Sequence, residues 1–337
     1  MLEVAGALYA LAAFVSVAGA TDGTVHARRG DTTWVTDDLG RTLVFARPPD
    51  RIVSLIPAVT EVLFAIGAGE SVAGRSRWDD YPPEVLNLPN LGDAVRPSTE
   101  LVLAHRPDVV ILFAGSDNVP AVREFERLGI PSLAVALNTL PDFERTVGRL
   151  GLLTGRTEAA EALLTGVRRE LRRVKELTRH LPPRSVYYDI WYPPAITIGA
   201  GSYLDSLIAI VGGRNIFSDL ASPSPQVSLE AIAERDPEVI LYPLTAEPAG
   251  RQTPPTKRPG WNAVRAVREG SVRTVDADIV HRLGPRIGQA AAILAVAIHP
   301  EVGVVGPPDG APPARGGGRG SAGRPLEGPM AVRSDAP

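Results

Sequence analysis

The apolar positions along the chain follow two spacings, and stretches with one spacing alternate with stretches of the other. Short runs rich in β-branched residues predict buried strands at 51–56, 71–76, 108–113 and 131–137. Between them, apolar residues at helical spacing predict helices over 58–69, 98–105 and 118–129. Strands that alternate with helices are typical of an α/β lobe with a largely parallel sheet, which we expect over 51–140.

The same alternation returns in the second half of the chain, over 184–300. Strands are predicted at 185–191, 195–199, 238–244 and 271–276, and helices at 202–213, after Glu230 and at 285–300. The intervening segment, 141–183, differs because residues 141–180 carry no strand signal and keep apolar residues at helical spacing. We expect near-continuous helix there, forming a stiff strut between the two lobes.

One sequence pattern occurs twice. The stretch STELVLAHRPDVVIL at 98–112 is echoed by VSLEAIAERDPEVIL at 227–241. Each copy places a glutamate, Glu100 or Glu230, at the head of an apolar helix face, and a proline, an acid and a β-branched strand follow. A second echo occurs in the same order, because VTEVLFAIGAG at 59–69 is similar to YLDSLIAIVGG at 203–213. The chain is therefore predicted to be a pseudo-duplicated pair of α/β lobes. A cleft between such lobes, at the carboxyl ends of strands, is a usual place for a small ligand.

The two ends of the chain differ from its middle. Residues 1–20 are an apolar run that ends in small residues, which is typical of a secretory signal peptide, although the run carries Glu3 and no Lys or Arg. Residues 21–50 are read as an N-terminal extension, in which 34–45 predicts a β-hairpin. Residues 301–337 are rich in Gly, Pro and Arg, and we expect them to be disordered.

The composition narrows the possible functions. The net charge of −3 gives no electrostatic support for a nucleic-acid partner. The absence of cysteine excludes disulfides, thiolate metal sites, a cysteine nucleophile and a lipid-anchored cysteine in this sequence. The histidines are scattered, and no P-loop or G-x-S-x-G motif occurs, so we predict neither a metal site nor catalytic residues. A binding protein is favoured, with a two-lobed redox or transfer enzyme and a surface adhesion module as alternatives from other classes.

The stretch TDDLGRTLVFARPPDRIVSLIPAVTEVLFAIG resembles the opening of the periplasmic substrate-binding proteins that serve ABC importers for iron chelates, heme and vitamin B12. The motifs WDDYPPEV, SPSPQVSLEAI, VGGRNIF and HRLGPRI are most similar to the vitamin B12-binding branch, and the resemblance covers residues 34–300. It implies two α/β lobes, a long interlobe helix, and limited opening and closing around the ligand. It also implies a monomer without a cofactor, located in the periplasm or secreted.

The resemblance gives the repeated glutamates a role. In the vitamin B12 branch a surface glutamate on each lobe docks on the permease dimer in the membrane, and Glu100 and Glu230 fall on those positions. A pseudo-twofold protein that meets a twofold permease needs one acidic group on each lobe. The alternative is that each glutamate merely favours the N-terminus of its helix, which is worth about 0.3–1 kcal/mol.

The resemblance also implies ligand-binding residues and a ligand, cobalamin or a related corrinoid, that is delivered without chemistry. Trp78 falls on an aromatic residue that lies against the corrin ring. Asp278 and Arg282 fall on an acid and an arginine of the last loop, which would serve as acceptor and donor for the amide side chains of the corrin.

The chain departs from the vitamin B12 branch at two positions. Tryptophans that this branch places in the cleft correspond here to Ala94 and Ser224. Trp191 and Tyr192 are expected to restore aromatic surface from a different strand.

Two other ligands stay open. An anionic ferric siderophore would be held by cationic and tyrosine groups, for which the candidates are Arg75, Arg77, Arg282, Arg286, Tyr81 and Tyr188. Heme would use an axial tyrosine or histidine, and His281 beside Arg282 is the candidate.

Overall fold

The computed structural model describes residues 27–29, 32–92, 97–245 and 252–303. The expected signal peptide at 1–20, position Ala94 and the tail from residue 304 onward lie outside the described residues. Both predicted lobes fall within one compact unit. In the described part of the chain, no helix is both long enough and apolar enough to cross a membrane.

The N-terminal extension forms a small antiparallel sheet of β1 (Ala27–Arg29), β2 (Thr32–Thr36) and β3 (Thr42–Phe45). The hairpin predicted over 34–45 is confirmed, because β2 and β3 pair with Trp34 opposite Val44. Asp37 closes the turn, since its carboxylate accepts hydrogen bonds from the backbone N–H groups of Leu39 (3.0 Å) and Arg41 (2.9 Å). The hairpin register is thus fixed by a side chain within the turn.

The first α/β lobe has a parallel sheet in the order β5-β4-β6-β7. Its strands are β4 (Ile52–Ser54), β5 (Val72–Arg75), β6 (Val109–Phe113) and β7 (Ser132–Val135). Its helices are α1 (Pro57–Ala65), α2 (Thr99–Ala104) and α3 (Val119–Arg127). All residues of β4 and β7 are buried, as expected for parallel strands that are covered on both faces.

The second lobe repeats this arrangement. Its sheet has the order β11-β10-β8-β9, again parallel. The strands are β8 (Arg184–Tyr188), β9 (Gly213–Asn215), β10 (Val239–Leu244) and β11 (Val272–Asp276). The helices are α6 (Tyr203–Ile210), α7 (Leu229–Arg235), α8 (Arg265–Arg268), α9 (Ala277–Val280) and α10 (Ile287–Ile298). Numbered along the chain within each lobe, both sheets have the order 2-1-3-4, which confirms the predicted duplication.

The strand predicted at 195–199 is wrong. Ile196 forms only isolated bridges, to Trp191 and Gln226. The segment follows Pro193 and Pro194, which have no N–H to donate to a ladder, and the position beside β8 is taken by the short strand β9. Ala195 and Ile198 are buried because the chain folds back on itself there, and not because they extend the sheet.

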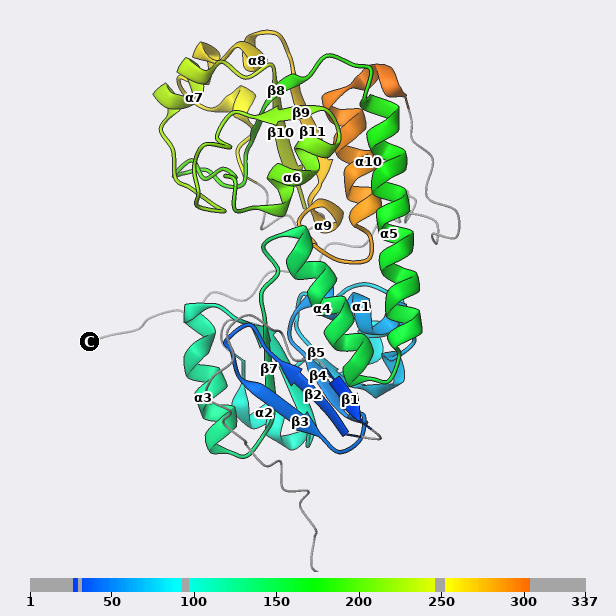
Figure 1. The fold of residues 1–337 in the computed structure, drawn as a ribbon. Coiled ribbons are helices and arrows are strands. Elements are labelled where there is room, and N and C mark those ends of the chain that lie inside the picture. The colour runs from blue at the N-terminus through cyan, green and yellow to red at the C-terminus, as the bar shows by residue number, and fades with distance from the viewer. Residues whose placement is uncertain (1–26, 30–31, 93–96, 246–251, 304–337) are drawn as a thin grey trace, which may run out of the picture. The chain divides into compact units, whose positions relative to one another are not determined.

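The connecting segment forms two helices, α4 (Leu140–Leu153) and α5 (Thr157–Thr178), where one near-continuous helix was predicted. The chain turns at Gly155, whose φ of 68° is unfavourable for other residues. The helices pack closely, because a Cβ on Gly151 would lie 2.6 Å from the Cβ of Ala160. Figure 1 shows α5 beside α4 of the first lobe and beside α10 of the second. Its 22 residues span about 33 Å, so α5 is the rigid link between the lobes.

The repeated sequence pattern has a structural function in each lobe. The acid after the proline, Asp108 or Glu238, holds the start of the first strand of its sheet. The Asp108 carboxylate accepts hydrogen bonds of 2.9 Å from the N–H groups of Asp50 and Arg51, just before β4. The Glu238 carboxylate accepts one of 2.7 Å from the N–H of Ser185, at the start of β8. Each copy of the pattern therefore fixes where its sheet begins.

We expect Glu238→Gln to lower the free energy of unfolding by about 1 kcal/mol at pH 7, because a charge-assisted hydrogen bond becomes a neutral one. The Ser185 hydrogen bonds hold the pKa of Glu238 below its usual range. Its charged form therefore adds stability above the unfolded-state pKa, and this stability is lost as the pH falls through the folded-state pKa. Urea denaturation at neutral pH and near pH 3 measures the free energy of unfolding of both proteins. The difference between Glu238→Gln and wild type should be smaller near pH 3.

The control is Glu234→Gln, which changes an exposed glutamate of α7. If Glu238→Gln lowers the free energy of unfolding equally at both pH values, or if Glu234→Gln lowers it as much, the Glu238 carboxylate does not stabilise the start of β8.

Candidate functional site

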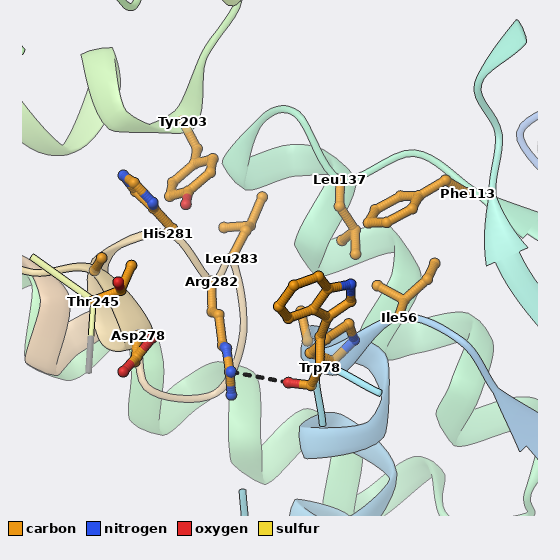
Figure 2. A pocket seen from close by; sticks show the side chains of 13 residues that line it. Ile56, Trp78, Phe113, Leu137, Tyr203, Thr245, Asp278, His281, Arg282 and Leu283 are labelled. Atoms are coloured by element: carbon orange, nitrogen blue, oxygen red, sulfur yellow. Dashed lines mark hydrogen bonds between the residues drawn. The ribbon is translucent and has the colours of Figure 1, made fainter. Parts of the chain in front are cut away.

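A cavity of about 400 Å³ lies where the carboxyl ends of strands from both sheets meet (Figure 2). The first lobe supplies residues after β4 and β5, the last residue of β6 and a residue after β7, and the second supplies residues after β10 and β11 and the start of α6. They are Ile56, Pro57, Ala58, Trp78, Phe113, Leu137, Tyr203, Thr245, Ala277, Asp278, His281, Arg282 and Leu283. Ligands of parallel α/β sheets bind at this edge, and the cleft predicted between the lobes is confirmed.

Trp78 stands on the wall of this cavity with 52% of its surface exposed. Figure 2 shows its ring turned toward the apolar side chains of Ile56 and Leu137. The guanidinium of Arg77 lies 4.6 Å from the centroid of the indole, at a cation–π distance. An aromatic ring that stays this exposed beside an apolar wall offers a flat surface for a ligand.

The loop that carries Trp78 is fixed within its own lobe. Asp79 is buried, and its carboxylate accepts hydrogen bonds from the N–H (2.8 Å) and the hydroxyl (2.5 Å) of Ser76. The hydroxyl oxygen of Ser76 in turn accepts from the N–H of Trp78 at 3.2 Å. Burial raises the pKa of Asp79 above its ordinary value, because its charged form loses solvation. The indole is therefore presented by a pre-formed turn.

The same loop is also held from the opposite lobe. Arg282 donates hydrogen bonds to the backbone carbonyl of Trp78 (3.1 Å), to Asp80 (2.5 Å) and to Glu61 (3.1 Å). Arg286 donates to both carboxylate oxygens of Glu61, at 2.9 and 2.6 Å. The side chain of Glu61, on α1, is only 1% exposed. A buried carboxylate of the first lobe thus lies between two guanidinium groups of the second.

The polar side chains on the far wall are His281 and Tyr203. The Tyr203 hydroxyl donates to the carbonyl of Val280 at 2.9 Å, and burial raises its pKa, so it stays neutral. His281 is partly exposed, but the atoms packed around its ring reduce its solvation and lower its pKa below the ordinary value, so the imidazole is neutral at pH 7. The backbone N–H of Tyr203 donates to the carbonyl of Asn138 at 2.6 Å, which is a direct main-chain contact between the lobes.

Three of the predicted ligand residues meet at the cavity, and three do not line it. Trp78, Asp278 and Arg282 are brought together. The indole of Trp191 is exposed and donates to the carbonyl of Pro193 at 3.1 Å. The other two residues lie apart from the cavity lining: Tyr192 packs edge-on against Trp261, with the guanidinium of Arg258 4.3 Å from its ring, and Ser224 is exposed.

The glutamates predicted to dock on a permease are equivalent in the two lobes. Glu100 and Glu230 are both exposed in the first turn of their helices, α2 and α7. Each helix begins with a serine cap, since Ser98 accepts from the N–H of Leu101 and Ser228 from that of Ala231. The repeated sequence pattern therefore gives each lobe an acidic group in the same structural position.

Sequence reasoning missed Glu61 and the apolar residues Phe113 and Leu137. Phe113 and Leu137 lie where predicted strands end, and that position alone could have marked them. Glu61 gave no such signal, because an acid near the start of a helix is usually explained by the helix dipole. In the described part of the chain, no group of His, Asp and Glu is placed to hold a metal ion.

The chain has two α/β lobes whose parallel sheets share one strand order, with a long helix between the lobes and a cavity at the carboxyl ends of the strands. These features define a two-lobed ligand-binding protein. Comparison with known proteins makes the class more specific. The sequence profile described as periplasmic binding protein matches residues 52–279. The chain belongs to this family, so it is a substrate-binding protein of an ABC transporter and not an enzyme.

Similar proteins carry several names. A vitamin B12-binding protein of Pectobacterium carotovorum is 29% identical over 261 residues, which cover 77% of this chain and 91% of that protein. An uncharacterised ABC transporter substrate-binding lipoprotein of Bacillus subtilis, YvrC, is 26% identical over 79% of this chain and 85% of its own length. The structure of the periplasmic heme-binding protein RhuT from Roseiflexus superposes with a TM-score of 0.66 at 26% identity, over 75% of this chain and 99% of that one.

We expect Trp78→Ala to lower the free energy of unfolding by only about 1–2 kcal/mol, because half of the side chain stays in solvent and the rest contacts Arg77 and the apolar wall. Trp261→Ala should cost about 3–5 kcal/mol, since Trp261 is fully buried against Tyr187 and Tyr192. Denaturant unfolding of both variants measures the difference. A large loss of stability for Trp78→Ala would show that its indole is a structural residue.

Proposed function

We propose that the chain captures cobalamin or a related corrinoid and delivers it unchanged to the permease of an ABC importer. The observation that carries this proposal is the exposed ring of Trp78 on an apolar cavity wall. A corrin presents a broad face that an indole covers, and its amide-bearing rim takes hydrogen bonds from a few polar groups. The vitamin B12-binding relative supports the same ligand.

The charges around the cavity favour a ligand that is not strongly anionic. Arg282 and Arg286 face the carboxylates of Glu61 and Asp80, so their positive charge is already compensated. Asp278 adds a further carboxylate to the lining. An anionic ferric siderophore needs cationic groups whose charge is not compensated, and the charge of these two arginines is already compensated.

The other predicted residues take secondary roles in this proposal. Asp278 and Arg282 supply an acceptor and a donor for amides at the rim of the corrin. Trp191, Tyr192 and Ser224 lie outside the lining, so they contact only the part of a ligand that extends beyond the cavity. A corrinoid with its nucleotide loop is large enough to extend in this way.

Delivery requires docking outside the cytoplasmic membrane, in the periplasm or at the outer face. A single copy of the chain would place Glu100 and Glu230 against equivalent basic patches on the two permease subunits. Hydrogen bonds from its own backbone N–H and from Ser228 lower the pKa of Glu230, which keeps that group charged at neutral pH.

Heme is the second candidate, and His281 favours it. The imidazole is neutral and lines the cavity, and its ring centroid lies 5.8 Å from that of Tyr188. A neutral imidazole is a common axial ligand of heme iron. Trp78 and Leu283 would then cover the porphyrin instead of the corrin.

Titration of residues 21–337 with cyanocobalamin, followed by tryptophan fluorescence with inner-filter correction, tests the ligand. We expect saturable one-to-one quenching at submicromolar concentration, and about 5- to 150-fold weaker binding for Trp78→Ala, since a stacked ring is worth about 1–3 kcal/mol. Trp191→Ala, which removes an indole that does not line the cavity, should weaken binding less.

Hemin and a ferric hydroxamate are titrated in parallel. Saturation by hemin but not cyanocobalamin, with a Soret band that shifts in His281→Ala, would replace the corrinoid by heme. Saturation by the hydroxamate alone would show that the compensated arginines become available to an anionic ligand.

Docking is tested by reversing both charges, with Glu100→Arg and Glu230→Arg in one protein. We expect uptake into cells or vesicles that carry the cognate permease to be lost, while the Kd for the ligand stays within about twofold, because both residues lie on exposed helix turns. Uptake at the wild-type rate would show that these glutamates do not dock.

A further inference from the structure

The contact between the lobes around Glu61 is built from charges. Glu61 belongs to α1, whereas Arg282 and Arg286 belong to the turn between α9 and α10. Arg286 also lies with its guanidinium 4.2 Å from the ring centroid of Tyr81, so it contacts the first lobe twice. Three side chains of the first lobe thus contact the two arginines: the carboxylates of Glu61 and Asp80 and the ring of Tyr81.

This arrangement is a poor way to gain stability. Removing a carboxylate from water costs several kcal/mol, and two cations offset most of that cost without a large surplus. What a bidentate guanidinium supplies is a defined geometry, because both carboxylate oxygens must lie in the plane of its donors. Arg286 binds Glu61 in this two-point way, so the distance between α1 and the start of α10 is fixed.

The same contact reaches the ligand cavity. Arg282 donates to Glu61 and, through its other terminal nitrogen, to the backbone carbonyl of Trp78. Arg282 also lines the cavity itself. Any movement of the second lobe away from Glu61 therefore pulls on the loop that presents Trp78.

We propose that Glu61, Arg282 and Arg286 form an interlobe latch, which holds the lobes at one spacing and couples that spacing to the orientation of Trp78. Glu61 is a positioning residue, since it acts on the ligand through Arg282 and Trp78. The latch rests on the binding function proposed above but not on the identity of the ligand. The lobes of the ligand-free protein accordingly occupy a narrow range of separations.

The chain contains a matched control for the latch. Asp38 is a largely buried carboxylate that also pairs with two arginines, Arg145 at 3.1 Å and Arg149 at 2.7 Å. Both of these arginines lie on α4, which packs with the first lobe, so this cluster does not join the lobes. Asp38→Asn therefore removes the same kind of charge without touching the interlobe contact.

The spacing of the lobes is measured with two spin labels. Because the native sequence has no cysteine, Arg123→Cys on α3 and Glu234→Cys on α7, both exposed, are the only sites that take the label. Double electron–electron resonance of the ligand-free protein then gives the distribution of distances between the two labels, one on each lobe. Glu61→Gln should shift and broaden this distribution and change the tryptophan fluorescence of the protein, and Asp38→Asn should leave the distribution unchanged.

Arg286→Gln is made in parallel as a second variant, in which Glu61 keeps its ion pair with Arg282. A folded Glu61→Gln or Arg286→Gln protein with the wild-type distribution would overturn the latch. An equal broadening in Asp38→Asn would overturn it as well, since the effect would then follow from losing any buried ion pair.

Cyanocobalamin and hemin serve as the ligands that test whether the spacing of the lobes is coupled to binding at Trp78. For whichever of them binds, Glu61→Gln should weaken affinity about tenfold, within the range of typical coupling between sites, and mainly through faster dissociation. If neither probe binds, the proposed ligand fails, while the label distances still test the latch. Wild-type affinity in a Glu61→Gln protein whose lobes have moved apart would refute the coupling to Trp78.

Discussion

The parallel pairing of β4 with β5 and β6, and of β8 with β9 and β10, constrains the rest of the structure. In a parallel sheet all strands end at one edge, so the loops that follow them gather in one place. With two such sheets in one chain, loops from five or more strand ends share a small volume. The cavity residues are far apart in sequence for this reason, and they come in short groups from the ends of several strands.

A second constraint is electrostatic. Loops at the carboxyl ends of strands carry polar residues, and bringing two sets of them together buries charge. In this protein the charges are matched across the interface: Arg282 and Arg286 face Glu61 and Asp80. The cavity next to them can therefore stay apolar, with Trp78 and Leu137 on its wall. The apolar binding surface therefore depends on the pairing of charges between the two lobes.

The sequence was sufficient to predict elements whose signal is local. The hairpin at 34–45, the alternation of strands and helices and the duplicated order of the lobes follow from periodicity and turn residues. The break at Gly155 was missed because one glycine in a long helical pattern is weak evidence for a turn. The partners of Arg282 lie about 200 residues away in sequence, and no local pattern encodes such a contact. Trp78 was placed at the cavity by resemblance, whereas its support by Ser76 and Asp79 required the structure.

The hydrogen bond between the N–H of Tyr203 and the carbonyl of Asn138 has an evolutionary consequence. Because both groups belong to the main chain, no substitution except proline at position 203 removes either of them. The side chains around the cavity other than Arg282 can therefore be exchanged one at a time while this junction persists. Such a scaffold can acquire a new ligand by drift in its lining, without passing through intermediates whose lobes have lost their contact.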